Sequence, residues 1–398
     1  MDNRTMVSVE QALSCINEVK CISEEVEVLV SSEITGCILS KEVYATNNLP
    51  LFSQSAIDGY AVCFGTESHF KILNDEIKAG DTKEFSLKKG EAIRIFTGAA
   101  VPYNTDAVVM QEKVKIKKNI LYVDEQLKKE QNIRHKGEEI QVNQKIFSSG
   151  GKITPATVGL LASLGISKVK IYRKPTMAVI VTGNELLSLN EKLTYGKIYD
   201  SNSYTLGSFL LEQKIEVIQY YYVKDHLEET QKTISETLRK HDIILITGGI
   251  SVGDYDFVKK SLEENGVEEI FYKVKQKPGK PLFFGKKENA FVFGLPGNPA
   301  AALTCAYVYV LPLINRFKGE KEIHLKRAKG VALNHYEKKN DRAQFLKAVF
   351  RNNQVQILQG QGSGMMHSFA KCNALVFMPE SKTEIQEKEE IDDVLLLF

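Results

Sequence analysis

The sequence predicts a multidomain protein of the α/β plus β class. Between residues 173 and 322, short apolar strands alternate with helical patterns, which is typical of a parallel sheet with right-handed crossovers. Residues 45–140 and 323–398 contain mainly short strands separated by turns, so we expect a β-rich domain and a small C-terminal β-barrel-like domain. Helical patterns lie on both sides of the first β-rich segment. One interpretation is that this segment is inserted into an elongated, discontinuous domain.

Two helices flank the predicted insertion. Residues 8–20 carry apolar side chains on one helical face, and Ser8 with Gln11 forms an S-x-x-Q capping box. The second helix has Thr154 as its cap and Pro155 at its first position, and we expect it to end at Gly165. Between them, strands are predicted at 92–96, 107–110, 113–117 and 120–123.

The remaining elements follow the same signals. In the α/β region we expect helices at 203–213, 226–240 and 255–263, with strands at 215–223, 243–247 and 269–274. A further helix begins after Pro299 and is expected to stop near Pro312, because proline usually ends a helix. Tail strands are predicted at 330–333, 343–351, 354–359 and 374–378.

Bulk properties exclude several classes of function. A formal net charge of +2 gives no global attraction to nucleic acid or to a membrane surface, so any anion site must be local. The six cysteines and seven histidines form no C-x-x-C or H-x-x-x-H pair, which argues against a zinc or iron enzyme and favours buried thiols. We expect no apolar run to reach the roughly 20 residues of a membrane span, and the N-terminus lacks a signal-peptide core. We therefore expect a cytoplasmic protein.

Three strand ends carry the main functional signal. Each is a short apolar strand that runs into a small polar turn: Ala178–Val181 into Thr182–Glu185, Ile243–Ile246 into Thr247–Ser251, and Phe291–Phe293 into Gly294–Pro299. The carboxyl ends of parallel strands meet at one crevice, and glycine turns let backbone N–H groups approach an anion. The pattern predicts a site for a phosphorylated or oxyanionic small molecule, although each turn alone could be a purely structural strand-to-helix connection.

Charged residues near these turns suggest how such a site would work. Lys273, Lys275, Lys277 and Lys280 lie in a segment stiffened by Pro278 and Pro281, which favours an anion clamp over a solvated basic edge. Glu185, Asp225 and Asp254 follow predicted strands and are candidate Mg²⁺ ligands, with capping or surface charge as the alternative. In the tail, Ser363 lies in a glycine-dense loop that could be either a contact or a mobile loop.

Taken together, the chain resembles the MoeA family of molybdopterin molybdenumtransferases, which includes the gephyrin E domain. The matching segments occur in the family's order: Ser55–Tyr60, Ile95–Ala99 with Pro102, Val181–Leu186, Thr247–Asp254, Lys277–Pro281 and Gly294–Pro299. The resemblance implies domain I at 1–44 and 141–172, domain II at 45–140, domain III at 173–322 and domain IV at 323–398. Domain III would be an adenylyltransferase-like, three-layer α/β domain, and domain IV a β-barrel.

The resemblance also implies the reaction. Members insert molybdate into adenylylated molybdopterin and release AMP with Mg²⁺, usually as homodimers whose cleft lies between domain III of one subunit and domain II of the other. The molybdopterin adenylyltransferase and acceptor molybdoenzymes are the implied further partners; nucleic acid and membrane are not.

Roles carry over by motif position. Catalytic roles are implied for Asp58, Thr97, Glu185, Lys273 and Lys277. Substrate binding is implied for Asp225, Thr247, Gly248, Gly249, Ser251, Lys280, Pro296, Gly297, Asn298, Pro299 and Ser363. Metal binding is implied for Asp254, Glu185 and Asp225.

Two departures from the family pattern concern oxyanion contacts. Ala300-Ala301 stands where serine is frequent after the Gly-Asn-Pro turn, and Lys347 occupies what we take to be an arginine position, where lysine keeps the charge but loses bidentate geometry.

Two other functions share parts of this pattern. A molybdopterin adenylyltransferase would share the α/β domain, but Asp58, Thr97 and the β-rich tail favour molybdenum insertion. A gephyrin-like scaffold is disfavoured because the chain lacks a long Pro/Ser-rich linker and a second domain.

Overall fold

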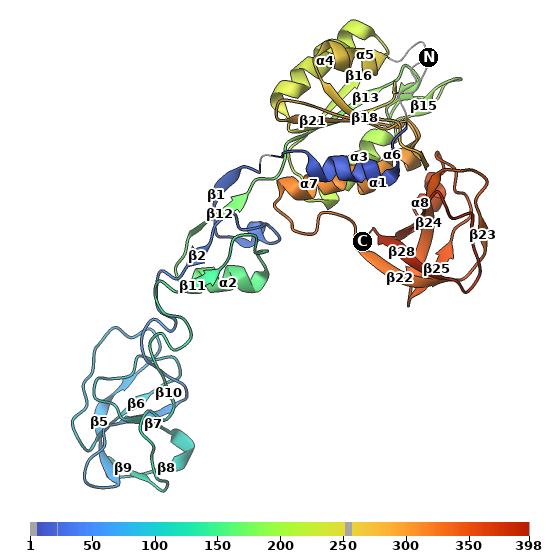
Figure 1. The fold of residues 1–398 in the computed structure, drawn as a ribbon. Coiled ribbons are helices and arrows are strands. Elements are labelled where there is room, and N and C mark those ends of the chain that lie inside the picture. The colour runs from blue at the N-terminus through green and yellow to red at the C-terminus, as the bar shows by residue number, and fades with distance from the viewer. Residues whose placement is uncertain (1–5, 22, 251–256, 398) are drawn as a thin grey trace. The chain divides into compact units, whose positions relative to one another are not determined.

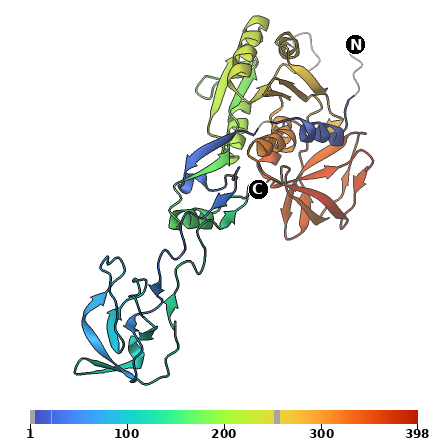
Figure 2. The same ribbon diagram turned by 60° about the vertical axis from the view of Figure 1, so that its left-hand side comes forward.

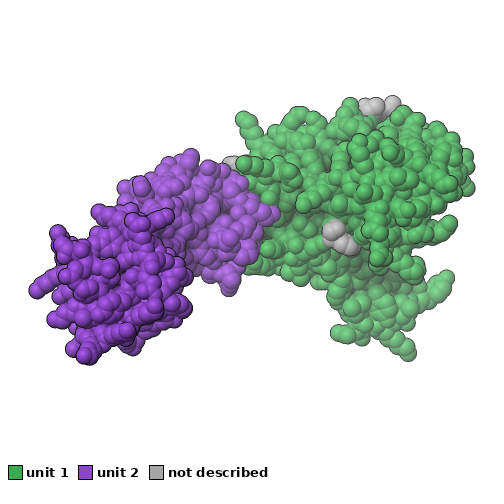
Figure 3. Space-filling view, turned by 90° about the horizontal axis from the view of Figure 1, so that it is seen from below, with its two compact units in different colours: residues 1–25, 172–398 green, residues 26–171 purple. Residues whose placement is uncertain are grey.

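The computed structural model describes residues 6–21, 23–250 and 257–397. The chain forms two compact units, one of residues 1–25 and 172–398 and the other of residues 26–171, which Figure 3 colours separately. The first unit contains an α/β domain and a C-terminal barrel (Figure 1). The four domain boundaries derived from the sequence remain a prediction.

A six-stranded sheet forms the centre of the α/β domain, in the order β16-β13-β17-β21-β20-β18. These strands are β13 (Met177–Thr182), β16 (Ile218–Val223), β17 (Ile243–Thr247), β18 (Glu268–Tyr272), β20 (Phe283–Lys287) and β21 (Ala290–Leu295). The first four in this order are mutually parallel, as predicted. The sequence analysis missed β20, which pairs antiparallel with both of its neighbours, so the sheet is mixed rather than wholly parallel.

Both faces of this sheet are buried, which produces three layers. Along β13, Val179 and Val181 face one apolar cluster and Ala178 and Ile180 face another, because side chains of a strand alternate between its faces. Helices α4 (Leu227–Lys240) and α5 (Phe257–Glu264) cover one face (Figure 1). The other face packs on α1 (Val9–Glu18), α3 (Asn202–Glu212), α6 (Pro299–Cys305) and α7 (Leu311–Phe317). The capping box of Ser8 and Gln11 forms as predicted.

The helix after Pro299 continues past Pro312, which corrects the expected stop. A π turn, Ala306–Val310, joins α6 to α7, and Pro312 lies in the first turn of α7. The π turn changes the hydrogen-bonding pattern where proline lacks a donor and would clash with the preceding turn. By length and composition, Pro299–Phe317 is the one helix among the described residues that could cross a membrane, contrary to the expectation from sequence. Within the protein, 83% of its apolar window is buried.

The C-terminal segment forms a closed barrel (Figure 2). Neighbouring strands of the barrel pair in the order β24-β25-β22-β28-β26. Strand β26 also pairs with β24, which closes the barrel. The barrel strands are β22 (Arg327–Ala332), β24 (Ala343–Arg351), β25 (Gln354–Ile357), β26 (Ala374–Met378) and β28 (Glu390–Leu396). The short elements around it are β23 (Tyr336–Glu337), α8 (Met366–Phe369) and β27 (Glu384–Ile385). A two-residue strand from the α/β domain, β19 (Gln276–Lys277), pairs with β24 in parallel.

The second unit is mostly β-structure. Its largest sheet has the order β7-β4-β6-β5-β9-β8 and comprises β4 (Gly59–Val62), β5 (His69–Ile77), β6 (Glu91–Ile95), β7 (Ala107–Met110), β8 (Val114–Lys117) and β9 (Ile120–Val123). The predicted hairpin joins β8 to β9, with Lys118 and Asn119 at positive φ. The remaining elements are β1 (Glu25–Leu29), β2 (Val43–Tyr44), β3 (Gln54–Ser55), β10 (Ile133–Arg134), β11 (Lys145–Phe147), α2 (Pro155–Ser163), β12 (Lys168–Tyr172) and two short 3-10 helices, Ser32–Ile34 and Gln111–Lys113.

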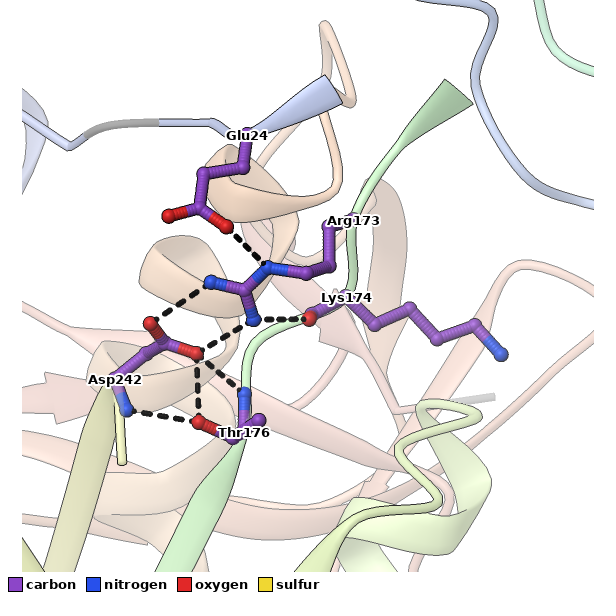
Figure 4. Close-up of polar contacts among 5 residues, drawn as sticks. All are labelled: Glu24, Arg173, Lys174, Thr176 and Asp242. Carbon is purple, nitrogen blue, oxygen red and sulfur yellow. Dashed lines mark hydrogen bonds and ion pairs between the residues drawn. The ribbon is translucent and has the colours of Figure 1, made fainter. Parts of the chain in front are cut away.

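An ion-pair cluster fixes both chain segments that lead from the first unit to residues 26–171 (Figure 4). The Arg173 guanidinium binds Asp242 through two nitrogens, at 2.8 and 3.0 Å, and its Nε donates to Glu24 at 2.8 Å. Thr176 donates to Asp242 from both its backbone and its hydroxyl. Although burial of Asp242 opposes ionisation, these hydrogen bonds from Arg173 and Thr176 leave its pKa below the ordinary value.

We expect Arg173→Met to lower the free energy of unfolding of this unit by about 2–3 kcal/mol, because a half-buried carboxylate would lose its partner. Lys174→Met is the matched control: Lys174 pairs with an exposed Glu216, so the loss should stay within about 1 kcal/mol. Urea unfolding of both variants measures the difference. Since the folded pKa of Asp242 is lowered, the wild-type advantage should be full above the unfolded pKa and vanish as the pH falls through the folded value. Equal losses in the two variants would contradict this prediction.

Candidate functional site

A cleft of about 650 Å³ opens where the parallel strands of the α/β sheet end. Val181 of β13 pairs in register with Thr247 of β17, and Thr247 with Leu295 of β21, so three strands finish at the same level. Their turns therefore meet at one edge of the sheet, as the sequence predicted. The lining includes the following residues from these turns: Thr182, Glu185, Gly248, Pro296, Gly297, Asn298 and Pro299.

Two glycines allow these turns to approach each other closely. Gly248 has φ +86°, and a Cβ there would lie 2.7 Å from Thr182 Oγ1 and closer still to its carbonyl oxygen. A Cβ on Gly297 would lie 3.8 Å from the Gly248 Cα, so the two backbones are neighbours. Thr247 lies beneath them, buried, and its carbonyl accepts a hydrogen bond from Thr182 Oγ1. The cleft floor is consequently made of backbone, to which an anionic ligand can come close.

The cationic side chains of the cleft come from other segments of the chain than the strand-end turns. Lys277 ends β19, Lys280 lies between β19 and β20, and Arg342 lies just before β24 of the barrel; all three line the cleft. Arg342 donates from a guanidinium nitrogen to the Gln276 carbonyl at 3.3 Å. No ion pair or hydrogen bond of the Lys277 or Lys280 ammonium group occurs within the described ranges. Three cationic side chains beside these turns, against the two acidic side chains of Glu185 and Asp200 in the same lining, favour an anionic ligand.

The barrel also contributes the loop that carries Ser363. The Asn298 side-chain amide donates to Ser363 Oγ at 2.9 Å, and the Ala301 N–H donates to the Ser363 carbonyl at 3.0 Å. Asn298 occupies the N-cap position of α6 as expected, but its side chain makes no capping hydrogen bond to the helix. The barrel loop supplies an acceptor for the helix N-terminus instead. Ala300 and Ala301 are buried beneath this contact.

Lys347 does not line the cleft. Its side chain is buried, and Nζ donates to the carbonyls of Gly360, Gly362 and Met365 at 2.8–3.2 Å. Desolvation by burial lowers the pKa of this ammonium group. Lys347 therefore supports the Ser363 loop from inside, and the cation that lines the cleft from this part of the barrel is Arg342.

The acidic residues predicted to bind metal divide between the cleft and its border. Glu185 is exposed and lines the cleft. Asp225 follows β16 and accepts a hydrogen bond from the Asn184 N–H at 3.2 Å, so it braces the turn that carries Glu185. Asp254, like Ser251, lies outside the described residues. Among the residues that the structure describes, no three His, Cys, Asp or Glu side chains are grouped as metal ligands.

Other predicted residues lie away from the lining. Gly249 follows Gly248 in the turn, at φ +56°. Lys273 places its Nζ 4.8 Å from the centre of the Tyr272 ring. In the second unit, Asp58 accepts hydrogen bonds from both the N–H and the hydroxyl of Thr97, at 2.8 and 2.7 Å. These bonds lower the pKa of Asp58, which keeps its carboxylate ionised on an exposed surface.

Sequence reasoning missed several residues of the lining, among them Asp200, Ser201, Asn202 and Arg342. Asp200 accepts from the Ser203 N–H and hydroxyl, and Asn202 donates to the Gly297 carbonyl at 2.8 Å. The Asp-Ser-Asn run just before the predicted helix at 203–213 was the available signal, because such residues start helices. For Arg342 no local signal existed, since only the barrel fold brings it to the cleft.

Fold and site together define a multidomain protein with a cation-lined cleft at the strand ends of its α/β domain, to which a C-terminal barrel contributes Arg342 and Ser363. The sequence pattern of the MoeA N-terminal region (domain I and II) matches residues 7–165. A probable molybdopterin binding domain matches 178–316, and the MoeA C-terminal region (domain IV) matches 329–396.

Whole-chain comparisons agree. A molybdopterin molybdenumtransferase of Haemophilus influenzae is 34% identical over 97% of this chain and 98% of its own length, and one of Staphylococcus epidermidis is 30% identical over 99% and 97%. The crystal structure of a molybdopterin biosynthesis MoeA protein from Pyrococcus horikosii matches with a TM-score of 0.84 at 28% identity, over 98% of this chain and 99% of that one. The chain belongs to the MoeA family of molybdenum cofactor biosynthesis proteins, whose curated members are transferases.

Gly248→Ala should disrupt the cleft. The substitution adds a Cβ at positive φ and forces it against Thr182. We therefore expect it to lower the free energy of unfolding by at least about 2 kcal/mol more than the same substitution at a glycine that also has positive φ but has open space around the added Cβ. Gly196→Ala is the matched control, because Gly196 has φ +80° and a Cβ added there would meet no atom within 4 Å. Thermal unfolding compares the two; similar shifts in Tm would contradict the close-approach argument.

Thr97→Ala should raise the Asp58 pKa part of the way toward its ordinary value. The hydroxyl donor disappears while the backbone N–H donor remains. Thr97→Ser keeps both donors and should leave the pKa where it is. Titration of the Asp58 carboxyl by ¹³C NMR measures both. An unchanged pKa in Thr97→Ala would show that the hydroxyl does not stabilise the carboxylate.

Proposed function

We propose that this protein inserts molybdate into adenylylated molybdopterin, with Mg²⁺-dependent release of AMP, to give the molybdenum cofactor. The observation that carries the proposal is the cleft itself. Backbone turns from three parallel strands face Lys277, Lys280 and Arg342 across one cavity of about 650 Å³. A volume of this size accommodates a ligand larger than an isolated oxyanion.

The charge arrangement fits two anionic substrates that repel each other. Molybdate is a dianion, and adenylylated molybdopterin carries a phosphoanhydride. Lysine ammonium groups and the guanidinium of Arg342 offset the repulsion when both bind in one cleft. Ser363, Asn202 and Asn298 add uncharged polar groups that orient ligands without cancelling the positive charge. Among the described residues the cleft holds no Ser-His-Asp arrangement, so positioning and electrostatics carry the catalysis in this proposal.

Glu185, with Asp225 behind it, fits a Mg²⁺ ion shared with substrate phosphates. Their turns follow adjacent parallel strands, since Thr182 pairs with Val223. Mg²⁺ typically takes one or two carboxylates and completes its shell with phosphate oxygens and water, so a cluster of three protein ligands is not required. When bound, the ion polarises the phosphoanhydride that yields AMP.

The assembly is also proposed. We place the protein in the cytoplasm as a homodimer in which Asp58 and Thr97 of the partner subunit complete the cleft. The support is their geometry: an exposed carboxylate held in one orientation by two hydrogen bonds is suited to contact a ligand. The molybdopterin adenylyltransferase would deliver the substrate, and acceptor molybdoenzymes would take the product.

Incubation with adenylylated molybdopterin, Mg²⁺ and molybdate tests the proposal. AMP release and cofactor formation should require all three, whereas ATP-dependent adenylylation of molybdopterin without molybdate would favour the adenylyltransferase alternative. The combined result that AMP is not released and molybdate does not bind would refute the proposal.

Lys277→Met should weaken molybdate binding about ten- to a hundredfold, because one charge-assisted contact is lost. Lys275→Met is the matched control from the same lysine run. Lys275 does not line the cleft, since its ammonium group is paired with Glu380 at 2.7 Å and Asp341 at 3.4 Å. Isothermal titration of each variant with molybdate gives the affinities, and an equal loss in both would mean that general surface charge is responsible.

A further inference from the structure

Lys277 and Lys280 lie on a segment that a buried pair of side chains holds by hydrogen bonds from the protein interior. This pair consists of Gln276, which is fully buried, and Tyr309, which is fully buried on the long helix. Neither residue lines the cleft, and neither carries charge at neutral pH. Their hydrogen bonds nevertheless end on the segment that carries Lys277 and Lys280.

Gln276 holds that segment at three points. Its side-chain Nε2 donates to the Gly279 carbonyl at 3.1 Å, across the base of the turn that separates Lys277 from Lys280. Its own carbonyl accepts from Arg342 at 3.3 Å. Its backbone pairs with Ala343 in the β19–β24 ladder. One residue thus connects the lysine segment, the third cation of the cleft and the barrel.

The Gly279 carbonyl sets the orientation of the Gln276 amide, and Tyr309 supplies the donor for the amide oxygen. The amide NH₂ faces the Gly279 carbonyl, which only accepts, so Oε1 must face Tyr309 and the hydroxyl donates to it. Burial raises the pKa of Tyr309 well above its ordinary value, so the hydroxyl stays protonated and remains a donor. Without that donor, a fully buried amide oxygen would lack a partner.

The long helix carries Tyr309 at an irregular point. Tyr309 lies within the π turn Ala306–Val310, and single π turns inside α-helices are frequently found at functional sites. Close packing leaves the lysine segment little freedom to adjust. Gly279 has φ +86°, and a Cβ there would lie 2.5 Å from Cys305 Sγ of the same helix.

We propose that Gln276 and Tyr309 are positioning residues for the anion-binding lysines, holding Lys277, Lys280 and Arg342 in the arrangement that binds the oxyanion substrate. This rests on the proposed function, because it takes these cations to bind molybdate. Loss of the pair leaves every charge in place but loosens the segment that carries two of them, so affinity falls through geometry rather than through charge.

Tyr309→Phe tests the inference, since it removes one oxygen atom and keeps the ring. We expect about tenfold weaker molybdate binding by isothermal titration and a matching rise in the KM for molybdate, with a smaller change in kcat. Tyr307→Phe is the control: Tyr307 lies on the same π turn and its hydroxyl donates to Glu212 at 2.8 Å, away from the lysines. It should bind molybdate like the wild type.

A second variant distinguishes the joint effect of Gln276 and Tyr309 on affinity from a general loss of stability. Gln276→Met removes the amide that connects the helix to the loop, and in that background Tyr309→Phe should have no further effect on affinity, because the two residues act as one unit. Additive losses would overturn the inference. Wild-type affinity in Tyr309→Phe, or in Gln276→Met should Tyr309→Phe fail to fold, would also overturn it. If the wild-type protein itself neither binds molybdate nor releases AMP, the proposed function fails instead.

Discussion

The cleft depends on the register of three parallel strands that are buried on both faces. Strands β13, β17 and β21 alternate their side chains between two apolar clusters, and a slip of one residue would exchange those faces. Because the register is fixed in this way, Val181, Thr247 and Leu295 end at one level. The polar turns that follow stay close together because a shift of any of these strands would disturb the apolar core. The turns themselves bury little apolar surface.

The positive side of the cleft is organised differently. Lys277 ends the two-residue strand β19, Lys280 lies in the turn that follows it, and Arg342 lies just before the barrel strand β24. The β19–β24 ladder and the contact of the Ser363 loop with α6 join the barrel to the α/β domain beside these residues, and the Gln276 side chain contacts the lysine segment from within the α/β domain. The barrel therefore supports one end of the lysine-rich segment that lines the cleft.

Buried polar side chains carry much of this support. Lys347 is satisfied by three carbonyls of the Ser363 loop, and Gln276 by Tyr309 and Gly279. In an apolar surrounding such groups are costly when unpaired, so each favours one loop conformation over alternatives. The Arg173–Asp242 cluster works by the same principle at the start of β17, where it fixes the segments that lead to residues 26–171.

The sequence by itself determined the elements and the strand-end turns, because apolar periodicity, capping residues and glycine act over a few neighbouring positions. It correctly placed α1 with its capping box, the β8–β9 hairpin, the parallel strands and four of the five barrel strands, but it missed β28 as well as β20. Only the tertiary structure decided that the helix after Pro299 passes Pro312 through a π turn, that Lys347 faces inward, and that Arg342 and Asn202 line the cleft. These outcomes depend on contacts with residues that are distant in sequence. Such contacts produce no periodic pattern in the neighbouring sequence from which they could be predicted.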